Sequence, residues 1–88
     1  MKFYVYLLLS KKGKSYFSYV GYTNNLQKRI HLHNTSKGAK YTKGKKWKLI
    51  YFESYDNKSK ALKEEYKLKK NYLLRNKIKK KFINNVKI

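Results

Sequence analysis

Glu65 is the acidic residue whose position most needs an explanation. The chain of 88 residues has 4 aspartates and glutamates against 24 lysines and arginines. A predicted helix over 60–70 places Glu65 near the centre of its apolar face and Glu64 beyond the edge of that face. A carboxylate there is costly to bury unless it pairs with a lysine or coordinates a cation, and the pattern leaves both partners open. The apolar face is formed by Ala61, Leu62, Tyr66 and Leu68.

Arg29 and His33 form a second candidate pair, one helical turn apart on the same side of a predicted helix. Arg29 and Arg75 are the only arginines in a chain rich in lysine. A planar guanidinium can hold two phosphate oxygens at once, which a lysine ammonium cannot. His33 can contact a phosphate, move a proton or form an ordinary hydrogen bond beside the apolar stripe. The alternative for Arg29 is a solvated helix surface, which is also where we expect His31.

Tyr6 and Tyr19 are expected to lie on neighbouring strands with their side chains directed inward. Ordinary packing is a strong alternative for both, because the chain has 10 tyrosines. A tyrosine hydroxyl titrates near pH 10, so it needs a nearby cation to take a proton from water at neutral pH. Arg29 or a metal ion could supply that charge, and Tyr6 is the better candidate for the role.

Three strands and one hairpin are predicted to carry the tyrosines. Apolar, aromatic and β-branched runs predict strands over 3–9, 15–22 and 47–54. A polar turn over 10–14 joins the first two strands, which makes them an antiparallel hairpin. Gly21 ends the second strand, where a side chain could block a close approach of another group.

Three helices are predicted to surround the strands. They run over about 24–34, 60–70 and 73–86, and Thr23 or Asn24 caps the first of them. The order β-β-α-β-α-α predicts an α/β fold of the α+β type, with a three-stranded antiparallel sheet flanked by helices. The length fits a single domain over residues 1–88. In the third helix the apolar stripe is formed by Leu74, Ile78, Phe82 and Val86.

The formal net charge of +20 indicates a polyanionic partner, which would relieve the self-repulsion of the chain. Nucleic acid is the favoured partner, an anionic membrane is the main competitor, and codon bias explains only the excess of lysine over arginine. The absence of cysteine excludes disulfides, thiolate catalysis and cysteine-based zinc sites, and it is compatible with the cytoplasm. No run approaches the roughly 20 apolar residues of a membrane span, so no membrane association by a spanning segment is expected.

A basic loop over 35–46 is the predicted nucleic-acid contact. It mixes cations with an aromatic ring, and such a surface can follow a phosphate backbone and stack on unpaired bases. Trp47, at the end of the loop, is expected to fold inward instead. The predicted contact residues are Lys37, Lys40, Tyr41, Lys43, Lys45 and Lys46.

The order of these motifs resembles the GIY-YIG nuclease superfamily. Tyr4-Val5-Tyr6 in the first strand and Tyr19-Val20-Gly21 in the second precede the helix with Arg29 and His33, and Glu65 follows on a later helix. Within this superfamily, the sequence most resembles the small stand-alone bacterial members known as UPF0213. The resemblance covers about residues 3–84. It is also carried by the runs 29–34, 37–42 and 61–66.

The resemblance implies a metal-dependent endonuclease that hydrolyses phosphodiester bonds. Glu65 is implied to hold one Mg²⁺ or Mn²⁺ ion, since magnesium takes one or two carboxylates and keeps its waters. Arg29 is implied to stabilise charge at phosphorus, with Tyr6 as base or water-positioning group and Tyr19 and His33 in support. DNA is favoured as the substrate over RNA, and no small-molecule cofactor is expected. The alternative is a nucleic-acid-binding module that keeps the fold without cleaving; the oligomeric state is not predicted.

Overall fold

The chain folds around one antiparallel sheet whose central strand is the first in the sequence. In the computed structural model, which describes residues 1–86, three strands pair in the order β2-β1-β3. β1 (Phe3–Lys12) thus lies between β2 (Ser15–Thr23) and β3 (Lys48–Tyr55). The predicted order β-β-α-β-α-α is confirmed. The helices within those residues are α1 (Leu26–Asn34), α2 (Lys58–Lys70) and α3 (Tyr72–Val86).

The hairpin turn is tighter than the predicted loop over 10–14. β1 continues to Lys12, which pairs with Ser15 at the start of β2, so two residues make the turn. Gly13 occupies the first of these positions with a φ of 63°. A two-residue hairpin of type II′ needs a positive φ there, and glycine adopts it without the steric cost of a Cβ. The polar residues of the predicted loop therefore extend the strands instead of interrupting them.

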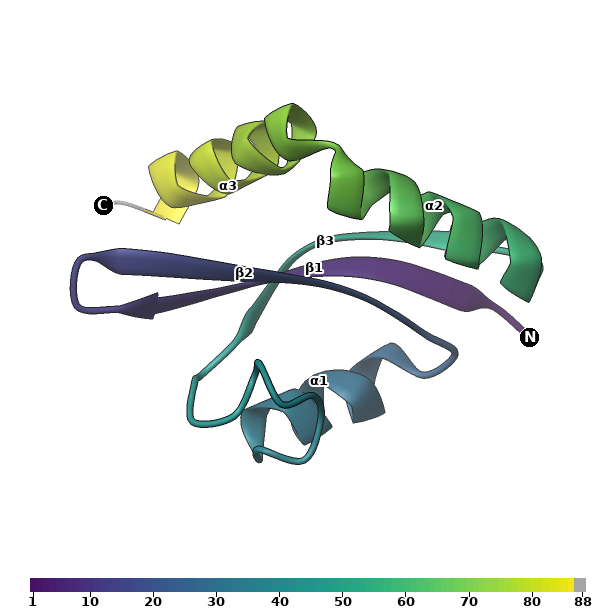
Figure 1. Cartoon of the computed structure of the whole chain (residues 1–88), viewed down its shortest axis with the longest axis horizontal. Helices are drawn as coiled ribbons and strands as arrows, with labels where there is room; N and C mark the ends of the chain where they lie inside the picture. The colour runs from purple at the N-terminus through teal and green to yellow at the C-terminus, as the bar shows by residue number, and fades with distance from the viewer. Residues whose placement is uncertain (87–88) are drawn as a thin grey trace.

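Side chains of β1 alternate between two covered faces of the sheet. α2 and α3 lie over one face, and α1 with the loop that follows it lies over the other (Figure 1). Val5 and Leu7 join the core under α2, whereas Tyr6 and Leu8 join the core on the α1 side. A central strand buried on both faces reads as a continuous apolar run, and this explains the unbroken Tyr4-to-Leu9 stretch.

α2 is rotated relative to the apolar face predicted from the sequence. Its buried residues are Ala61 and Leu68, seven positions apart and therefore on one side of the helix. Leu62 and Tyr66 are 41% and 63% exposed, so their assignment to the packed face was wrong. The side of the helix that carries its two glutamates faces the sheet instead.

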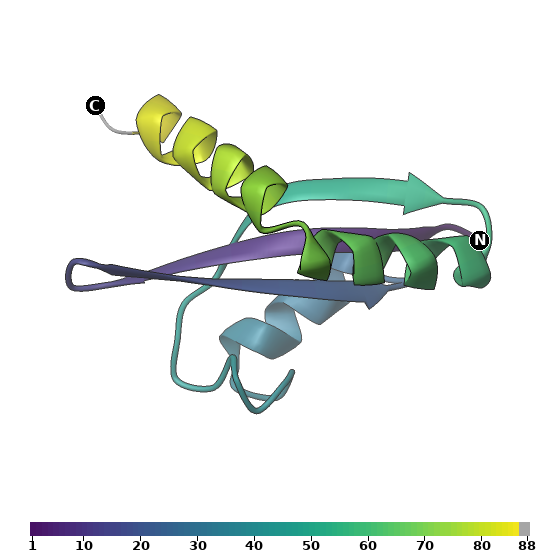
Figure 2. The ribbon, with the colours of Figure 1, turned by 45° about the horizontal axis from the view of Figure 1, so that its top comes forward.

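α3 follows directly from the end of α2 and contacts β3 (Figure 2). Ile78 packs against the core, but Leu74 is 39% and Leu73 80% exposed. The predicted stripe thus packs only in part, and the side chain of Val86 lies outside those that the structure describes. Among the described residues, no helix is long and apolar enough to cross a membrane.

α1 begins one or two residues later than predicted. Asn25 is its N-cap, and the side-chain oxygen of Asn25 accepts a hydrogen bond from the Lys28 amide at 3.2 Å. Thr23 stays in β2, where its hydroxyl oxygen accepts the Asn25 amide at 3.1 Å. The cap therefore fixes where α1 begins.

α1 ends at Asn34, one residue after His33, in a Schellman motif. The amide of Lys37 donates to the carbonyl of Leu32 at 2.8 Å, and the amide of Ser36 donates to the carbonyl of His33 at 3.3 Å. Ser36 has a φ of 62°, a left-handed conformation that such an ending requires. The chain then turns back toward the sheet, which brings the basic loop over the imidazole of His33.

Candidate active site

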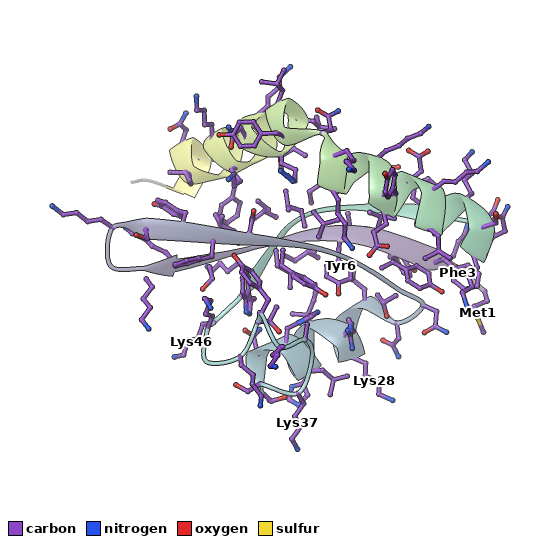
Figure 3. All side chains as sticks on the ribbon, viewed as in Figure 1. Met1, Phe3, Tyr6, Lys28, Lys37 and Lys46 are labelled. Atoms are coloured by element: carbon purple, nitrogen blue, oxygen red, sulfur yellow. The ribbon has the colours of Figure 1, made fainter. Side chains whose placement is uncertain are left out.

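The centre of the site is a buried hydrogen bond between Tyr6 and His33. The Tyr6 hydroxyl lies 2.8 Å from Nε2 of His33, and both residues are fully buried between the sheet and α1 (Figure 3). Gly21 is the register partner of Tyr6 on β2. A Cβ at Gly21 would overlap the Tyr6 ring and hydroxyl, so the predicted close approach at this glycine is confirmed.

The second nitrogen of His33 is held by the basic loop. Nδ1 of His33 lies 2.9 Å from the hydroxyl of Thr42, which is also fully buried. Gly38 contacts the face of the imidazole so closely that a Cβ would overlap the ring. Within the described part of the chain, no buried side-chain nitrogen or oxygen lacks a partner. The loop is therefore part of the interior of the protein as well as part of its surface.

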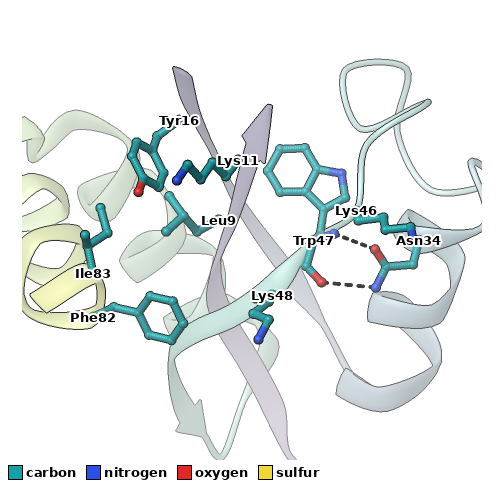
Figure 4. A pocket seen from close by; sticks show the side chains of 9 residues that line it. All are labelled: Leu9, Lys11, Tyr16, Asn34, Lys46, Trp47, Lys48, Phe82 and Ile83. Atoms are coloured by element: carbon teal, nitrogen blue, oxygen red, sulfur yellow. Dashed lines mark hydrogen bonds between the residues drawn. The ribbon is translucent and has the colours of Figure 1, made fainter. Parts of the chain in front are cut away.

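Asn34 closes the loop by pairing with the backbone of Trp47. Its amide nitrogen donates to the Trp47 carbonyl at 3.1 Å, and its amide oxygen accepts the Trp47 N–H at 2.6 Å (Figure 4). The indole N–H of Trp47 donates to the carbonyl of Thr42 at 3.0 Å. Trp47 is 4% exposed, which confirms that it folds inward. These bonds hold Thr42 against the histidine.

Tyr19 lies among rings rather than alone beside Tyr6. Its ring centroid is 4.9 Å from that of His33, 6.2 Å from that of Tyr41 and 6.5 Å from that of Tyr6. The two predicted tyrosines are thus brought together on neighbouring strands, as expected. The ring contacts give Tyr19 a packing role that would hold His33 and Tyr41 in place.

Arg29 is partly buried next to the Tyr6–His33 pair, and its charge acts on both residues. Burial raises the pKa of Tyr6 to about 12, although the Arg29 guanidinium pulls that pKa down. Burial lowers the pKa of His33, and the positive charge of Arg29 lowers it further. At neutral pH, Tyr6 is therefore protonated and His33 neutral. Arg29 alone does not make Tyr6 a base at neutral pH, because desolvation outweighs the guanidinium.

Glu64 and Glu65 both lie on the inward side of α2, between Ala61 and Leu68. Their side chains are 32% and 19% exposed, so Glu64 is not beyond the edge of the packed face as predicted. The two glutamates have different neighbours. Burial is the main cause of the raised pKa values of Tyr51 and Tyr55 on β3, and the charge of Glu64 raises them further. The charge of Glu65 instead contributes to the raised pKa of Tyr6.

Glu65 approaches the site from the other face of the sheet. Its carboxylate pairs with Lys69 at 3.6 Å, a distance at which the pairing is loose. The described residues contain no group of three or more histidines, cysteines and acids that could hold a metal ion. A lone, partly buried carboxylate still fits a hard cation such as Mg²⁺, which keeps most of its waters and also binds substrate phosphate.

The predicted contact residues of the loop differ in their surroundings. Tyr41 is 49% exposed, and the ammonium of Lys45 lies 5.2 Å from the ring centroids of both Tyr41 and Phe17. Lys45 is thus engaged with rings, although a cation over an aromatic face can still present charge. Figure 3 shows Lys28, Lys37 and Lys46 pointing outward on the α1 side. The exposed lysines of the predicted set are Lys37, Lys40, Lys43 and Lys46.

A pocket of about 780 Å³ opens beside the Asn34–Trp47 pairing and reaches Phe82 and Ile83 of α3 (Figure 4). Its described lining includes Lys46 but none of the five candidate catalytic side chains. The site is therefore built from the polar cluster between the sheet and α1, and not from this pocket.

Comparison with known proteins matches residues 2–81 to the model of the GIY-YIG catalytic domain. The chain belongs to this family, which is a family of endonucleases, and membership implies nucleic acid as the general class of substrate. Within the family its relatives are UPF0213 proteins. One from Clostridium perfringens is 52% identical over 68 residues, which are 76% of this chain and 70% of the relative. One from Oceanobacillus iheyensis is 45% identical over 67 residues, which are 75% and 74% of the two chains.

A solved structure of the same group is also similar. The solution NMR structure of a UPF0213 protein from Bacillus halodurans shares 32% sequence identity, covers 98% of this chain and 86% of its own, and superposes with a TM-score of 0.46.

Three residues of the site were not singled out in the sequence: Asn34, Gly38 and Thr42. All three belong to the runs that carry the family resemblance, but a hydroxyl in a lysine-rich loop gives no sign that it is buried. Asn34 looked like the plain end of a helix. Their roles depend on where the loop returns to the sheet, and no local pattern encodes that return.

Proposed function

We propose that this protein is a metal-dependent endonuclease that hydrolyses phosphodiester bonds, with DNA as its favoured substrate. The observation that carries the proposal is the buried Tyr6–His33 hydrogen bond with the Arg29 guanidinium beside it. A neutral histidine bonded to a protonated tyrosine can accept the proton that the tyrosine releases. A cation next to both groups stabilises negative charge that develops on a substrate phosphate.

The proposed reaction needs no free tyrosinate. The oxygen of a water molecule attacks phosphorus while its proton passes to the Tyr6 hydroxyl, and Tyr6 gives its own proton to Nε2 of His33. The bond between phosphorus and the leaving oxygen breaks, and that oxygen takes a proton from solvent. Arg29 stabilises the charge on the phosphate oxygens. Tyr6 has no exposed surface in the free protein, so binding of the substrate must uncover its hydroxyl.

Glu65 is the residue that would hold a divalent ion. A bound Mg²⁺ or Mn²⁺ would supply Lewis-acid chemistry, which stabilises negative charge on the phosphate and on the leaving group. The charges of Glu65 and Arg29 both act on the Tyr6 hydroxyl, which supports their assignment to one site. Glu64, which faces β3, is not assigned this role.

The charged loop is proposed to bind the backbone of the nucleic acid. Its solvated lysines can neutralise phosphates, and the exposed ring of Tyr41 can stack on an unpaired base. Binding by this surface would weaken as the salt concentration rises, since it depends on the release of counterions. The cleavage assay on duplex, branched and single-stranded substrates distinguishes which form is bound and cut.

The test is a cleavage assay on labelled duplex, branched and single-stranded DNA and RNA, with Mg²⁺, Mn²⁺ or EDTA. Arg29→Ala should reduce the turnover rate by about 10²–10³-fold, because it removes a charge that acts on the transition state. Glu65→Gln should abolish the response to metal. Each variant has a matched control in the chain. Arg75→Ala, at the other arginine, is the control for Arg29→Ala, and Glu64→Gln, at the neighbouring glutamate, is the control for Glu65→Gln.

Cutting that depends on metal, is lost in both test variants and survives in both controls would support the proposal. Binding without cutting, unchanged by Arg29→Ala and Glu65→Gln, would replace it with the non-cleaving binding module. Cutting that persists in Glu65→Gln across a metal titration would show that the ion is held elsewhere.

A further inference from the structure

Thr42 has three polar neighbours although its hydroxyl carries a single proton. Its Oγ1 accepts the backbone N–H of Ala39 at 3.1 Å, donates to the carbonyl of Ala39 at 2.9 Å and lies 2.9 Å from Nδ1 of His33. The Thr42 side chain is fully buried, so its hydroxyl finds its partners within the protein. A hydroxyl has one donor and two acceptor positions, and this arrangement uses all of them.

The direction of the Thr42 proton sets the direction of the other bonds in this cluster, and the geometry places that proton toward the carbonyl of Ala39. If the Thr42 proton goes to the carbonyl of Ala39, Oγ1 can only accept from His33. Nδ1 of His33 must then carry the hydrogen. The histidine is neutral, so Nε2 keeps its lone pair and the Tyr6 hydroxyl donates to it. Each group then has a partner of the opposite kind.

We infer that Thr42 is a positioning residue that holds His33 in the Nδ1–H tautomer, so that Nε2 is available to accept the proton of Tyr6. The catalytic consequence rests on the proposed function, whereas the tautomer is a property of the free protein. In the reverse arrangement the Thr42 proton points at Nδ1 and Nε2 carries the hydrogen. Tyr6 would then accept a bond from His33 and could not pass its proton to it.

The surroundings of Thr42 leave its hydroxyl little freedom to reverse. The Thr42 amide donates to the carbonyl of Ala39 at 3.1 Å, and the Thr42 carbonyl accepts the indole N–H of Trp47 at 3.0 Å. Gly38 contacts the imidazole ring and limits its tilt. These contacts hold the Thr42 backbone and the imidazole ring in place, so Oγ1 of Thr42 stays within hydrogen-bond distance of Nδ1 of His33.

The first test is a nitrogen NMR measurement on free, ¹⁵N-labelled protein at a pH where His33 is neutral. Long-range proton–nitrogen correlations distinguish a protonated ring nitrogen from one with a lone pair. We expect the protonated type at Nδ1 of His33. Exposed His31 on the same helix serves as an internal reference for a histidine without this environment. A hydrogen on Nε2 of His33 in the wild type would overturn the inference.

Two substitutions then separate the hydroxyl from the shape of the side chain. Thr42→Val keeps the volume and loses the hydroxyl, and Thr42→Ser keeps the hydroxyl. We expect Thr42→Val to lose the preference for Nδ1–H and to lower the turnover rate at least about 10-fold, as changes of a positioning partner commonly do. Thr42→Ser should retain the tautomer and most of the rate. A Thr42→Val variant that keeps both would also overturn the inference.

The design separates this inference from the proposed function. If the wild type shows Nδ1–H and Thr42→Val loses it, but no nucleic acid is cut, the role of Thr42 in selecting the tautomer stands and the nuclease proposal fails. If Thr42→Val does not fold, the spectrum of Thr42→Ser decides: a hydrogen on Nδ1 supports the inference, and a hydrogen on Nε2 contradicts it.

Discussion

The two faces of the sheet use different means to fill a buried interior. Under α2 the buried residues of the core are apolar, namely Val5, Leu7, Val20, Ala61 and Leu68, and the two glutamates of α2 beside them are only partly buried. Under α1 the equally buried interior contains a hydroxyl, an imidazole and a second hydroxyl in a hydrogen-bonded row: Tyr6, His33 and Thr42. Both faces are anchored by alternate residues of the same strand.

This difference determines which face tolerates substitutions without loss of function. An apolar interior depends on volume and tolerates exchanges that conserve it. A buried polar row depends on every partner being present, because a donor or acceptor left alone retains its full desolvation cost. The α2 face therefore stabilises the fold, and the α1 face stabilises one arrangement of protons.

Removal of volume from the apolar face should have the largest effect on stability. Leu7→Ala should lower the free energy of unfolding by about 2–5 kcal/mol, because Leu7 is fully buried and its loss leaves a cavity. Urea denaturation followed by circular dichroism measures the change. Leu7→Ile, which keeps the volume, should cost less than about 1.5 kcal/mol. Equal losses for the two variants would show that shape, not volume, governs this face.

Alkaline pH should destabilise the polar face through Tyr6. Its pKa rises from 10.0 to about 12 on folding, so the folded state holds this proton more tightly than the unfolded state. The resulting stability is fully present below pH 10 and is lost as the pH rises toward 12, on the order of 2 kcal/mol in total. Denaturation midpoints between pH 9 and 12 measure it.

Tyr6→Phe is the control for this alkaline effect. Tyr51 and Tyr55 also have raised pKa values, caused first by burial, so the wild-type profile combines several groups. Only the difference between wild type and Tyr6→Phe reports Tyr6. If the two profiles run parallel from pH 9 to 12, Tyr6 titrates in the folded protein as it does in the unfolded chain.

Acidic pH should destabilise the same face through His33. Its pKa is lowered in the folded state, so the unfolded state binds the proton more readily. Stability is therefore full above the unfolded pKa of about 6.5 and falls as the pH drops from there to the folded pKa. NMR titration of His33 measures the folded value. A folded pKa of His33 above about 6.5 would contradict this prediction.

The exposed side of α3 should show the smallest effect. Leu73 is 80% exposed, so Leu73→Glu should change the free energy of unfolding by no more than about 0.5 kcal/mol. The matched change Ile78→Glu, at a position packed against the core, should be strongly destabilising. Similar losses for both variants would mean that the outer side of α3 is covered in solution.

The strands and most helix boundaries could be predicted from the sequence because they follow local rules. Alternation, continuous apolar runs and capping residues depend on neighbours within a few positions. β1 was recognisable as a buried strand, and Gly21 as a place of close approach. The roles of Tyr6, Tyr19, Arg29, His33 and Glu65 came from the family resemblance, and they stay predictions.

The tertiary structure decided the rotation of α2 and the partners of His33. Leu62 and Tyr66 are as hydrophobic as the residues that pack, but the helix is oriented by its contacts with β1 and β2, and Ala61 and Leu68 face the sheet instead. Thr42 meets His33 only because Asn34 and Trp47 close the loop. Local patterns determine which elements form, whereas long-range packing determines which polar groups meet and where the protons lie.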